Sequence, residues 1–372
     1  MNSDSEIIEI LERALNNEKL RIQDGVTLLN SNNLTLLGAT ADYLRKFSVG
    51  DLVTFVVDRN INYTNICTSK CKFCAFYRSL SDKDAYVLSI QEILQKILEA
   101  VKLGATQILL QGGLHPTLPF EFYEDMLRQI KHKFPNLQMH AFSPPEIWNL
   151  SKNNGISIKE TLEILKDAGL DSIPGGGAEI LVDRVRSIVS PNKISWKNWK
   201  KVMEIAHSLN IPSSATMVFN LGETIEERVK HLIRIREMQE KTRGFTAFIP
   251  WSFQPKNTLL GAKATMQIEK EHNPFWATGV DYLKLLAVSR IILNNYIKNI
   301  QVSSVTQGTK IAQIALSYGA NDFGGTMIEE NVVRSAGVPF HRLSVKEIVR
   351  IVSETGRPVA KRDTLYNILE RY

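Results

Sequence analysis

Short apolar segments rich in β-branched residues alternate with segments of helical periodicity along most of the chain. Strand–helix alternation of this kind predicts parallel βαβ units. About eight strands predict an α/β fold of the TIM type, a (β/α) barrel that is complete or nearly so. The predicted strands are residues 52–57, 105–110, 137–142, 171–173, 213–219, 245–251, 300–305 and 321–323. The predicted helices between them are residues 89–103, 120–134, 161–168, 196–209, 225–239, 282–294 and 310–316.

Helical segments flank the predicted barrel at both ends. Residues 1–47 place apolar residues such as Ile7 and Leu11 at helical spacing and predict two or three helices. Residues 48–340 form the predicted barrel, and residues 341–372 are predicted to be a helical C-terminal extension. The pattern is compatible with a closed barrel and with one that is open at a seam. In such barrels the chemistry lies at the C-terminal ends of the strands, so residues that follow strands are the site candidates.

The composition is that of an ordinary globular protein, with 372 residues of which 44% are hydrophobic and 23% are charged. The net charge is +6 and the isoelectric point is about 9.0, but lysine and arginine are dispersed as on solvated helix faces. This dispersal argues against nucleic acid, and the positive surplus suits an anionic small-molecule substrate. No apolar run approaches the roughly 20 residues of a membrane helix, and the acidic N-terminus lacks a signal-peptide pattern. We therefore expect a cytoplasmic protein without a membrane partner.

The three cysteines of the chain lie within eight residues, in the sequence Cys67-Thr-Ser-Lys-Cys71-Lys-Phe-Cys74. An odd, clustered set is a poor disulfide framework and a good metal signal. Thiolates are preferred ligands of iron–sulfur clusters, and three of them leave one iron of a four-iron cluster open to a small molecule. A zinc site or an electron carrier would need a fourth ligand, and the nearest histidine, His115, is about forty residues away. We interpret the loop as a catalytic 4Fe–4S site, with a non-catalytic Fe–S or zinc-binding protein as the alternative.

The cysteine spacing, with the aromatic Phe73 before the last cysteine, resembles the signature of the radical S-adenosylmethionine (SAM) superfamily. The resemblance implies that SAM binds the open iron through its amino and carboxylate groups. It also implies that an electron donor such as flavodoxin or ferredoxin reduces the cluster and that SAM is cleaved. The resulting 5′-deoxyadenosyl radical takes a hydrogen atom from the substrate, while the protein positions the substrate and excludes water.

Longer motifs resemble the futalosine-pathway group of this superfamily, which contains dehypoxanthine futalosine cyclase, aminofutalosine synthase and deazaflavin (FO) synthase. The resemblance covers about residues 40 to 340 and rests on residues 60–78, 111–116, 140–146 and 174–179. The features most similar to the cyclase are residues 143–146, 178–186, 248–254, 318–324 and 329–331. The implied reaction takes hydrogen from the ribose 4′ carbon of dehypoxanthine futalosine and joins the sugar to the benzoate ring.

Two positions depart from the usual pattern of the group. Its Gly-His-x-Glu motif after the fifth strand is Asn220-Leu-Gly-Glu223 here, so Leu221 replaces the histidine. Ser304 stands where a tryptophan is usual, before Val-Thr-Gln at the seventh strand. Both positions are expected to face the site. They keep open the alternative of another substrate, as in aminofutalosine synthase or FO synthase.

The resemblance also implies a set of SAM contacts, each with a structural alternative. Glycines after the strand 105–110 let backbone carbonyls approach the SAM amino group, or they form a plain turn. Glu179, which follows three glycines, binds the SAM ribose or amino group, or it caps a helix. Tyr77 stacks on adenine, or it packs within the cysteine loop. The candidate cofactor-binding residues are Phe73, Tyr77, Gln111, Gly112, Gly113, Ser143 and Glu179.

Glu146 and His140 follow the third strand, and either can accept the proton that is lost when the product ring regains aromaticity. The alternative for Glu146 is a place in the first turn of a helix that Ser143 caps. Trp251 follows the sixth strand, whereas Asp322 has a hydrogen-bonded turn as its alternative. The candidate substrate-binding residues are His115, Trp251, Thr306, Gln307, Asn321 and Asp322.

Overall fold

The computed structural model of the chain describes residues 4–265, 275–339 and 342–372. At its centre, β1 and β2 form one strand that is interrupted at Val57, and β2 continues in parallel to β3 and β4. A second parallel run joins β5, β6 and β7. The bounds are β1 (Val53–Val56), β2 (Asp58–Asn62), β3 (Gln107–Gln111), β4 (Gln138–Ala141), β5 (Ser213–Phe219), β6 (Phe245–Ser252) and β7 (Asn299–Ile300).

Short pairings close these strands into a ring. Ser172 and Ile173 bridge β4 to β5 and so supply the fourth strand position. Gln301, next to β7, bridges to Asp322 at the start of β8 (Asp322–Gly325), and β8 pairs in parallel with β1. The predicted TIM-type α/β barrel is confirmed, and the ring is closed rather than open at a seam.

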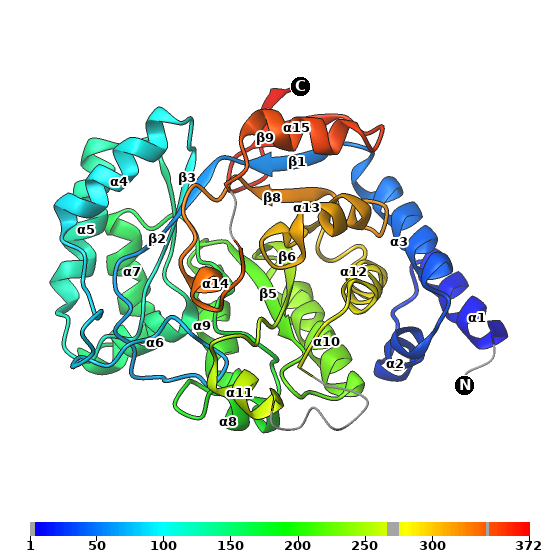
Figure 1. Cartoon of the computed structure of the whole chain (residues 1–372), viewed down its shortest axis with the longest axis horizontal. Helices are drawn as coiled ribbons and strands as arrows, with labels where there is room; N and C mark the ends of the chain where they lie inside the picture. The colour runs from blue at the N-terminus through cyan, green and yellow to red at the C-terminus, as the bar shows by residue number, and fades with distance from the viewer. Residues whose placement is uncertain (1–3, 266–274, 340–341) are drawn as a thin grey trace.

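Helices surround the ring, with α4, α5 and α7 on one side and α10 and α12 on the other (Figure 1). Local sequence sets their ends: Ser89 and Glu92 form the capping box of α4, and α7 ends at Gly169, whose φ of 119° is left-handed. The bounds are α4 (Ile90–Lys102), α5 (Phe120–Lys133), α6 (Pro144–Asn153), α7 (Ile158–Ala168), α8 (Asp183–Val189), α9 (Trp196–Ser208), α10 (Ile225–Thr242), α11 (Leu259–Thr265), α12 (Gly279–Leu293), α13 (Ser304–Ala315) and α14 (Val332–Ser335).

Three helices precede the barrel, as the periodicity of residues 1–47 predicts, and the third extends to Val49. They are α1 (Asp4–Leu15), α2 (Ile22–Asn30) and α3 (Leu34–Val49). Here α3 packs on α12 and α2 packs on α10, with Leu37 and Ala41 fully buried. These helices therefore cover the outer layer of the barrel far from the cysteine loop.

The C-terminal segment corrects the expectation of a helical extension. Among residues 342–372, only α15 (Val345–Ser353) is helical, and the strands β9 (Val359–Arg362) and β10 (Ile368–Arg371) follow it. β9 pairs in parallel with β1 on the side away from β8, and β10 pairs antiparallel with β9. A strand this short finds its place through a distant partner, which local periodicity does not reveal. The predicted boundary between residues 340 and 341 lies outside the described residues.

The seventh strand is also shorter than predicted. β7 spans two residues, and α13 already begins at Ser304 instead of residue 310. The Tyr282 hydroxyl accepts a hydrogen bond from the Ser303 amide at 2.8 Å, at the residue that precedes α13. Gly308, with a φ of 74°, kinks α13 after its first turn. Thr306 and Gln307 therefore lie on a helix.

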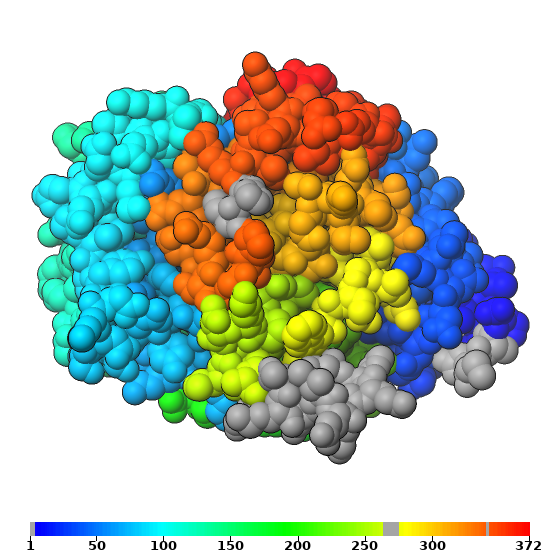
Figure 2. All heavy atoms as spheres, viewed as in Figure 1, coloured from blue at the N-terminus to red at the C-terminus, as the bar shows by residue number. Residues whose placement is uncertain are grey.

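The segment that includes α14 lies across the middle of the face seen in Figure 2, between the α4 side of the molecule and α13. This segment follows the end of β8 in the chain and passes over the barrel. Of the helices in the described ranges, none combines the length and apolarity that crossing a membrane requires.

Candidate active site

The cysteine loop leaves the C-terminal end of β2 and is tied to its own return segment. Ile66 bridges to Arg78, and the Cys67 amide donates to the Arg78 carbonyl at 3.0 Å. The Cys74 amide donates to the Cys71 carbonyl at 3.1 Å, which closes a turn between these two cysteines. Cys71 is buried, whereas Cys67 and Cys74 are partly exposed. The loop therefore holds all three thiols at the mouth of the barrel.

The donor set fits a 4Fe–4S cluster, because three unpaired thiols share one loop. Burial raises the pKa of Cys71 to about 12 and raises the pKa of Cys74, and the neighbouring cysteines add to both shifts. Adjacent thiolates in this setting need strong positive charge beside them, which the irons of a cluster supply. Within the described ranges, no three His, Cys, Asp or Glu side chains converge as one metal ion requires.

A cavity of about 250 Å³ lies inside the ring of strands. Four of the predicted residues line it: Gln111 at the end of β3, His140 on β4, Glu179 after the fourth strand position, and Trp251 on β6. The Trp251 Nε1 atom is buried and has no hydrogen-bond partner. These residues come from four different strand positions, as expected for a site at the mouth and centre of a (β/α) barrel.

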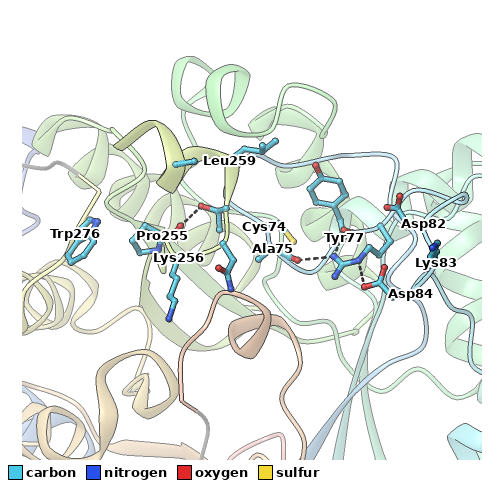
Figure 3. Close-up of a pocket in the computed structure, with 14 residues that line it drawn as sticks. Cys74, Ala75, Tyr77, Asp82, Lys83, Asp84, Pro255, Lys256, Leu259 and Trp276 are labelled. Carbon is cyan, nitrogen blue, oxygen red and sulfur yellow. Dashed lines mark hydrogen bonds and ion pairs between the residues drawn. The ribbon is translucent and has the colours of Figure 1, made fainter. Parts of the chain in front are cut away.

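A wider cavity of about 840 Å³ opens beside the cysteine loop. Figure 3 shows Cys74 and Tyr77 on one wall, and the segment from Pro255 to Leu259 with Trp276 on the other. Tyr77 therefore lines the same cavity as Cys74, and its stacking on adenine stays a prediction. Lys256 and Trp276 also line this mouth, and sequence reasoning did not single them out for the site.

The turn after β3 holds the cysteine loop by close packing. A Cβ atom on Gly112 would lie 2.5 Å from the Tyr63 ring, and one on Gly113 would lie 2.2 Å from the Ile66 carbonyl oxygen. The Gly113 amide donates to the Thr64 carbonyl at 3.0 Å. The two glycines are therefore needed for contact with the protein itself.

Glu146 is a buried carboxylate whose two oxygens are both occupied. Oε2 accepts from the Ser143 amide at 2.7 Å and from its hydroxyl at 2.5 Å, which is the capping box of α6. Oε1 accepts from the Tyr63 hydroxyl at 2.6 Å and from the Gly112 amide at 2.9 Å. Glu146 thus joins α6 to the turn after β3, as in the capping alternative. Of the two predicted proton acceptors, His140 is the one that lines the cavity.

Glu179 lies between the barrel cavity and the cysteine loop. Its side chain accepts from Lys193 Nζ at 2.8 Å and from Arg186 Nη1 at 3.1 Å. Burial alone would raise the pKa of Glu179, but the positive charges of Lys193 and Arg186 outweigh it and lower the pKa. Lys193 also lies over the Phe73 ring, 5.4 Å from its centroid. Glu179 is therefore a fixed carboxylate beside the loop, with a φ of 42° that its ion pairs hold.

Five predicted substrate contacts lie outside the lining of both cavities as far as the structure describes them. His115 Nδ1 accepts from the Leu118 amide at 2.9 Å and so caps a turn. Asn321 binds Arg290 at 2.9 Å, and Asp322 forms a buried ion pair with an arginine of β9. Thr306 binds the Ser303 hydroxyl at 2.7 Å, and Gln307 binds the Ser252 hydroxyl at 2.5 Å. All five thus have structural partners.

The two departures from the group pattern also lie away from both cavities. Leu221 is 2% exposed, and its amide donates to Glu223 at 2.7 Å. Ser304 is the first residue of α13. Neither residue lines these cavities, so the expectation that both side chains face the site is not met by the cavities that the structure describes.

The barrel cavity has further polar residues that sequence reasoning missed. Asp58 and Asn60 alternate along β2 with both side chains inward, and Arg362 and Tyr366 enter from the C-terminal segment. A polar residue at every second position of a strand was the available signal for the first pair. Arg362 and Tyr366 could not be found in this way, because the sequence pattern predicts a helical segment for residues 341–372 and not a strand beside the barrel.

Comparison with known proteins places two family models on the chain. The radical SAM superfamily matches residues 61–235, and the CofH/MqnC C-terminal region matches residues 242–371. A cyclic dehypoxanthine futalosine synthase of Halalkalibacterium halodurans is 45% identical over 98% of this chain and 95% of its own length. A 5-amino-6-(D-ribitylamino)uracil–L-tyrosine 4-hydroxyphenyl transferase of Methanocaldococcus jannaschii is 45% identical over 89% of this chain and 91% of its own.

Two solved structures share the fold. The [FeFe]-hydrogenase maturase HydG superposes with a TM-score of 0.74 at 17% identity, over 96% of this chain and 77% of its own. Methylornithine synthase superposes with a TM-score of 0.71 at 17% identity, over 94% and 96%. At this identity the likeness concerns the architecture alone.

Proposed function

The chain belongs to the radical SAM superfamily, and we propose that it converts dehypoxanthine futalosine into cyclic dehypoxanthine futalosine on the futalosine route to menaquinone. The enzyme uses a 4Fe–4S cluster and SAM. The observation that carries the proposal is the cavity inside the barrel, which joins polar and aromatic side chains and includes Glu179, whose charge also acts on Cys71 of the cysteine loop. Near full-length identity of 45% to a synthase of that name supports the same reaction.

Cys67, Cys71 and Cys74 would hold the cluster, and Glu179 with Gln111 would face SAM at the upper end of the barrel cavity. When bound, the cluster and SAM supply a carbon radical that removes one hydrogen atom from the substrate. Lys193 and Arg186 keep Glu179 ionised and fixed, so its carboxylate can accept from SAM hydroxyl or amino groups without rearrangement.

Cyclisation joins the ribose carbon to the benzoate ring, and the ring then loses one proton and one electron to regain aromaticity. The electron could return to the cluster, which would have given up one electron for the cleavage of SAM. Burial lowers the pKa of His140 to about 3, so its imidazole is neutral at pH 7 but is a weak base, and the case for His140 rests on its position. His140 Nδ1 lies 2.7 Å from the Ser172 hydroxyl, which fixes the ring, and its side chain lines the cavity. We therefore assign the proton to His140 and a positioning role to Glu146.

A second candidate is the transferase reaction on 5-amino-6-(D-ribitylamino)uracil and tyrosine. The observation in its favour is the 45% identity over 334 residues to the transferase of Methanocaldococcus jannaschii. That reaction needs an amino acid as a second substrate, whereas cyclisation has one substrate besides SAM. The number of substrates consumed therefore separates the two.

The test is anaerobic turnover by the cluster-loaded enzyme, with dithionite or a flavodoxin as the electron donor. Each proposed substrate is offered separately with SAM, and products are followed by mass spectrometry. The proposal expects cyclic dehypoxanthine futalosine together with an equal amount of 5′-deoxyadenosine. Turnover only with the uracil and tyrosine pair would replace the proposal by the second candidate.

A further inference from the structure

The end of the barrel opposite the cysteine loop is closed by the C-terminal segment. Thr364, just after β9, donates from its hydroxyl to Gln107 at 2.7 Å and from its amide to Gln138 at 2.8 Å. Gln107 and Gln138 are the first residues of β3 and β4, so these contacts lie at the N-terminal ends of the strands. Thr364 and Tyr366 line the cavity from this side. The segment thus forms a floor under the reaction cavity.

Two polar atoms near this floor lack partners inside the protein. The Asn60 Oδ1 atom and the Tyr366 hydroxyl are buried, line the cavity and form no hydrogen bond. Asn60 is 6% exposed, and the Tyr366 ring is held by Arg362, whose guanidinium lies 3.9 Å from the ring centroid. A buried polar atom without a partner is destabilising, and native proteins keep such atoms where a ligand or water completes them. The Asn60 Oδ1 atom and the Tyr366 hydroxyl can therefore each form a hydrogen bond with a polar group of a ligand.

The charges around the floor do not favour an anion. Among the described residues that line the barrel cavity, Arg362 is the one Lys or Arg, and Asp322 binds it through both carboxylate oxygens. The carboxylate of Asp58 also lines the cavity, so a negatively charged ligand group would meet an anion without a free cation. Lysines are found instead at the mouth, where Lys83 and Lys256 line the wider cavity.

We propose that Asn60 and Tyr366 determine specificity by binding the hydroxyl groups of the sugar part of the substrate at this floor. The inference rests on the proposed function and adds the direction in which the substrate lies. A ribose hydroxyl donates to Asn60 Oδ1 and another accepts from the Tyr366 hydroxyl, so that the rest of the sugar faces SAM at the upper end of the cavity. The cavity of about 250 Å³ is smaller than the usual 300–1,000 Å³ of small-molecule sites, so it takes one end of the substrate.

The test compares Tyr366→Phe with Tyr372→Phe, which removes the same atom from an exposed tyrosine of the same C-terminal segment. Binding of dehypoxanthine futalosine and of its 2′,3′-dideoxy analogue is measured by calorimetry on the cluster-loaded, unreduced enzyme with SAM. We expect Tyr366→Phe to weaken binding of the full substrate roughly tenfold and to leave binding of the analogue unchanged, because the lost partner is a hydroxyl. Asn60→Leu should behave likewise, and Tyr372→Phe should bind both ligands like the wild type.

The inference would be overturned if Tyr366→Phe bound each of the two ligands with the same affinity as the wild type does. SAM binding in each variant and its thermal midpoint show whether the barrel is intact. If the wild type does not bind dehypoxanthine futalosine, the proposed function fails. The comparison is then repeated with 5-amino-6-(D-ribitylamino)uracil, whose ribityl hydroxyls need hydrogen-bond partners of the same kind. A tenfold loss of affinity for this ligand in Tyr366→Phe would support the same role of Asn60 and Tyr366 under the second candidate function. An unchanged affinity would overturn the inference.

Discussion

Asp322→Ala removes one half of a buried ion pair that connects three strands of the barrel. Asp322 on β8 accepts from Arg362 Nη2 of β9 at 3.0 Å and also binds the Arg362 Nε atom. It accepts from the Thr54 hydroxyl of β1 at 2.6 Å. Asp322 is fully buried and Arg362 is 4% exposed. The variant therefore leaves a buried guanidinium without its counterion at the point where the ring closes.

The loss can be estimated from these contacts. Removing one partner of a buried ion pair costs about 3–5 kcal/mol, because the remaining charge is uncompensated. The lost hydrogen bond from Thr54 adds about 1 kcal/mol. We expect Asp322→Ala to lower the free energy of unfolding by about 5 kcal/mol, a large share of the roughly 5–15 kcal/mol of a typical domain.

The assay is urea unfolding of the cluster-free protein, followed by circular dichroism. Glu370→Ala is the matched control, because it breaks the Lys361–Glu370 pair of β9 and β10, whose Glu370 side chain is 50% exposed. An exposed pair of this kind contributes less than about 1 kcal/mol. Asp322→Leu combined with Arg362→Met removes both charges and should recover most of the loss. An unfolding midpoint of Asp322→Ala equal to that of the wild type would refute the reasoning.

Three further outcomes are expected. Cys67→Ala, Cys71→Ala and Cys74→Ala each lose the cluster, and iron analysis after reconstitution checks this; a full complement of four irons in any of them contradicts the ligand assignment. Glu179→Gln weakens SAM binding about tenfold in calorimetry, since Glu179 is held ionised by two cations; unchanged affinity makes it purely structural. Burial raises the pKa of Asp58 to about 6, so Asp58 lowers stability increasingly as pH rises from its unfolded value near 3.8 through 6. Asp58→Asn therefore raises the thermal midpoint of the cluster-free protein at pH 8 but not at pH 4, and an equal change at both pH values refutes this.

The barrel was predictable because its signals are local. Apolar runs and helical periodicity marked most strands and helices, and Ser89 with Glu92 marked the start of α4 three residues apart. The strand β9 was missed because its place depends on pairing with β1, some three hundred residues earlier in the chain. Its own short apolar stretch, Val359 and Ala360, is too brief to predict a strand.

The residues of the site also divide into those with a local sequence signal and those whose position depends on distant contacts. The cysteine loop was found from spacing alone, whereas the position of Glu146 depended on donors that only tertiary structure brings together, Tyr63 and Gly112. Ser143 and Glu146 have the same local pattern whether they contact a ligand or cap a helix. Tyr366 reaches the cavity because β9 lies beside β1. Its place in the site therefore depends on the pairing of β1 with β9, which the sequence pattern does not predict.

The most direct test of the central claim uses dehypoxanthine futalosine that carries deuterium at the ribose 4′ carbon. The cluster-loaded enzyme is reduced under anaerobic conditions with SAM, and 5′-deoxyadenosine is examined by mass spectrometry. Radical cyclisation predicts one deuterium in 5′-deoxyadenosine for each cyclic product formed. Unlabelled 5′-deoxyadenosine without cyclic product would contradict the proposed reaction.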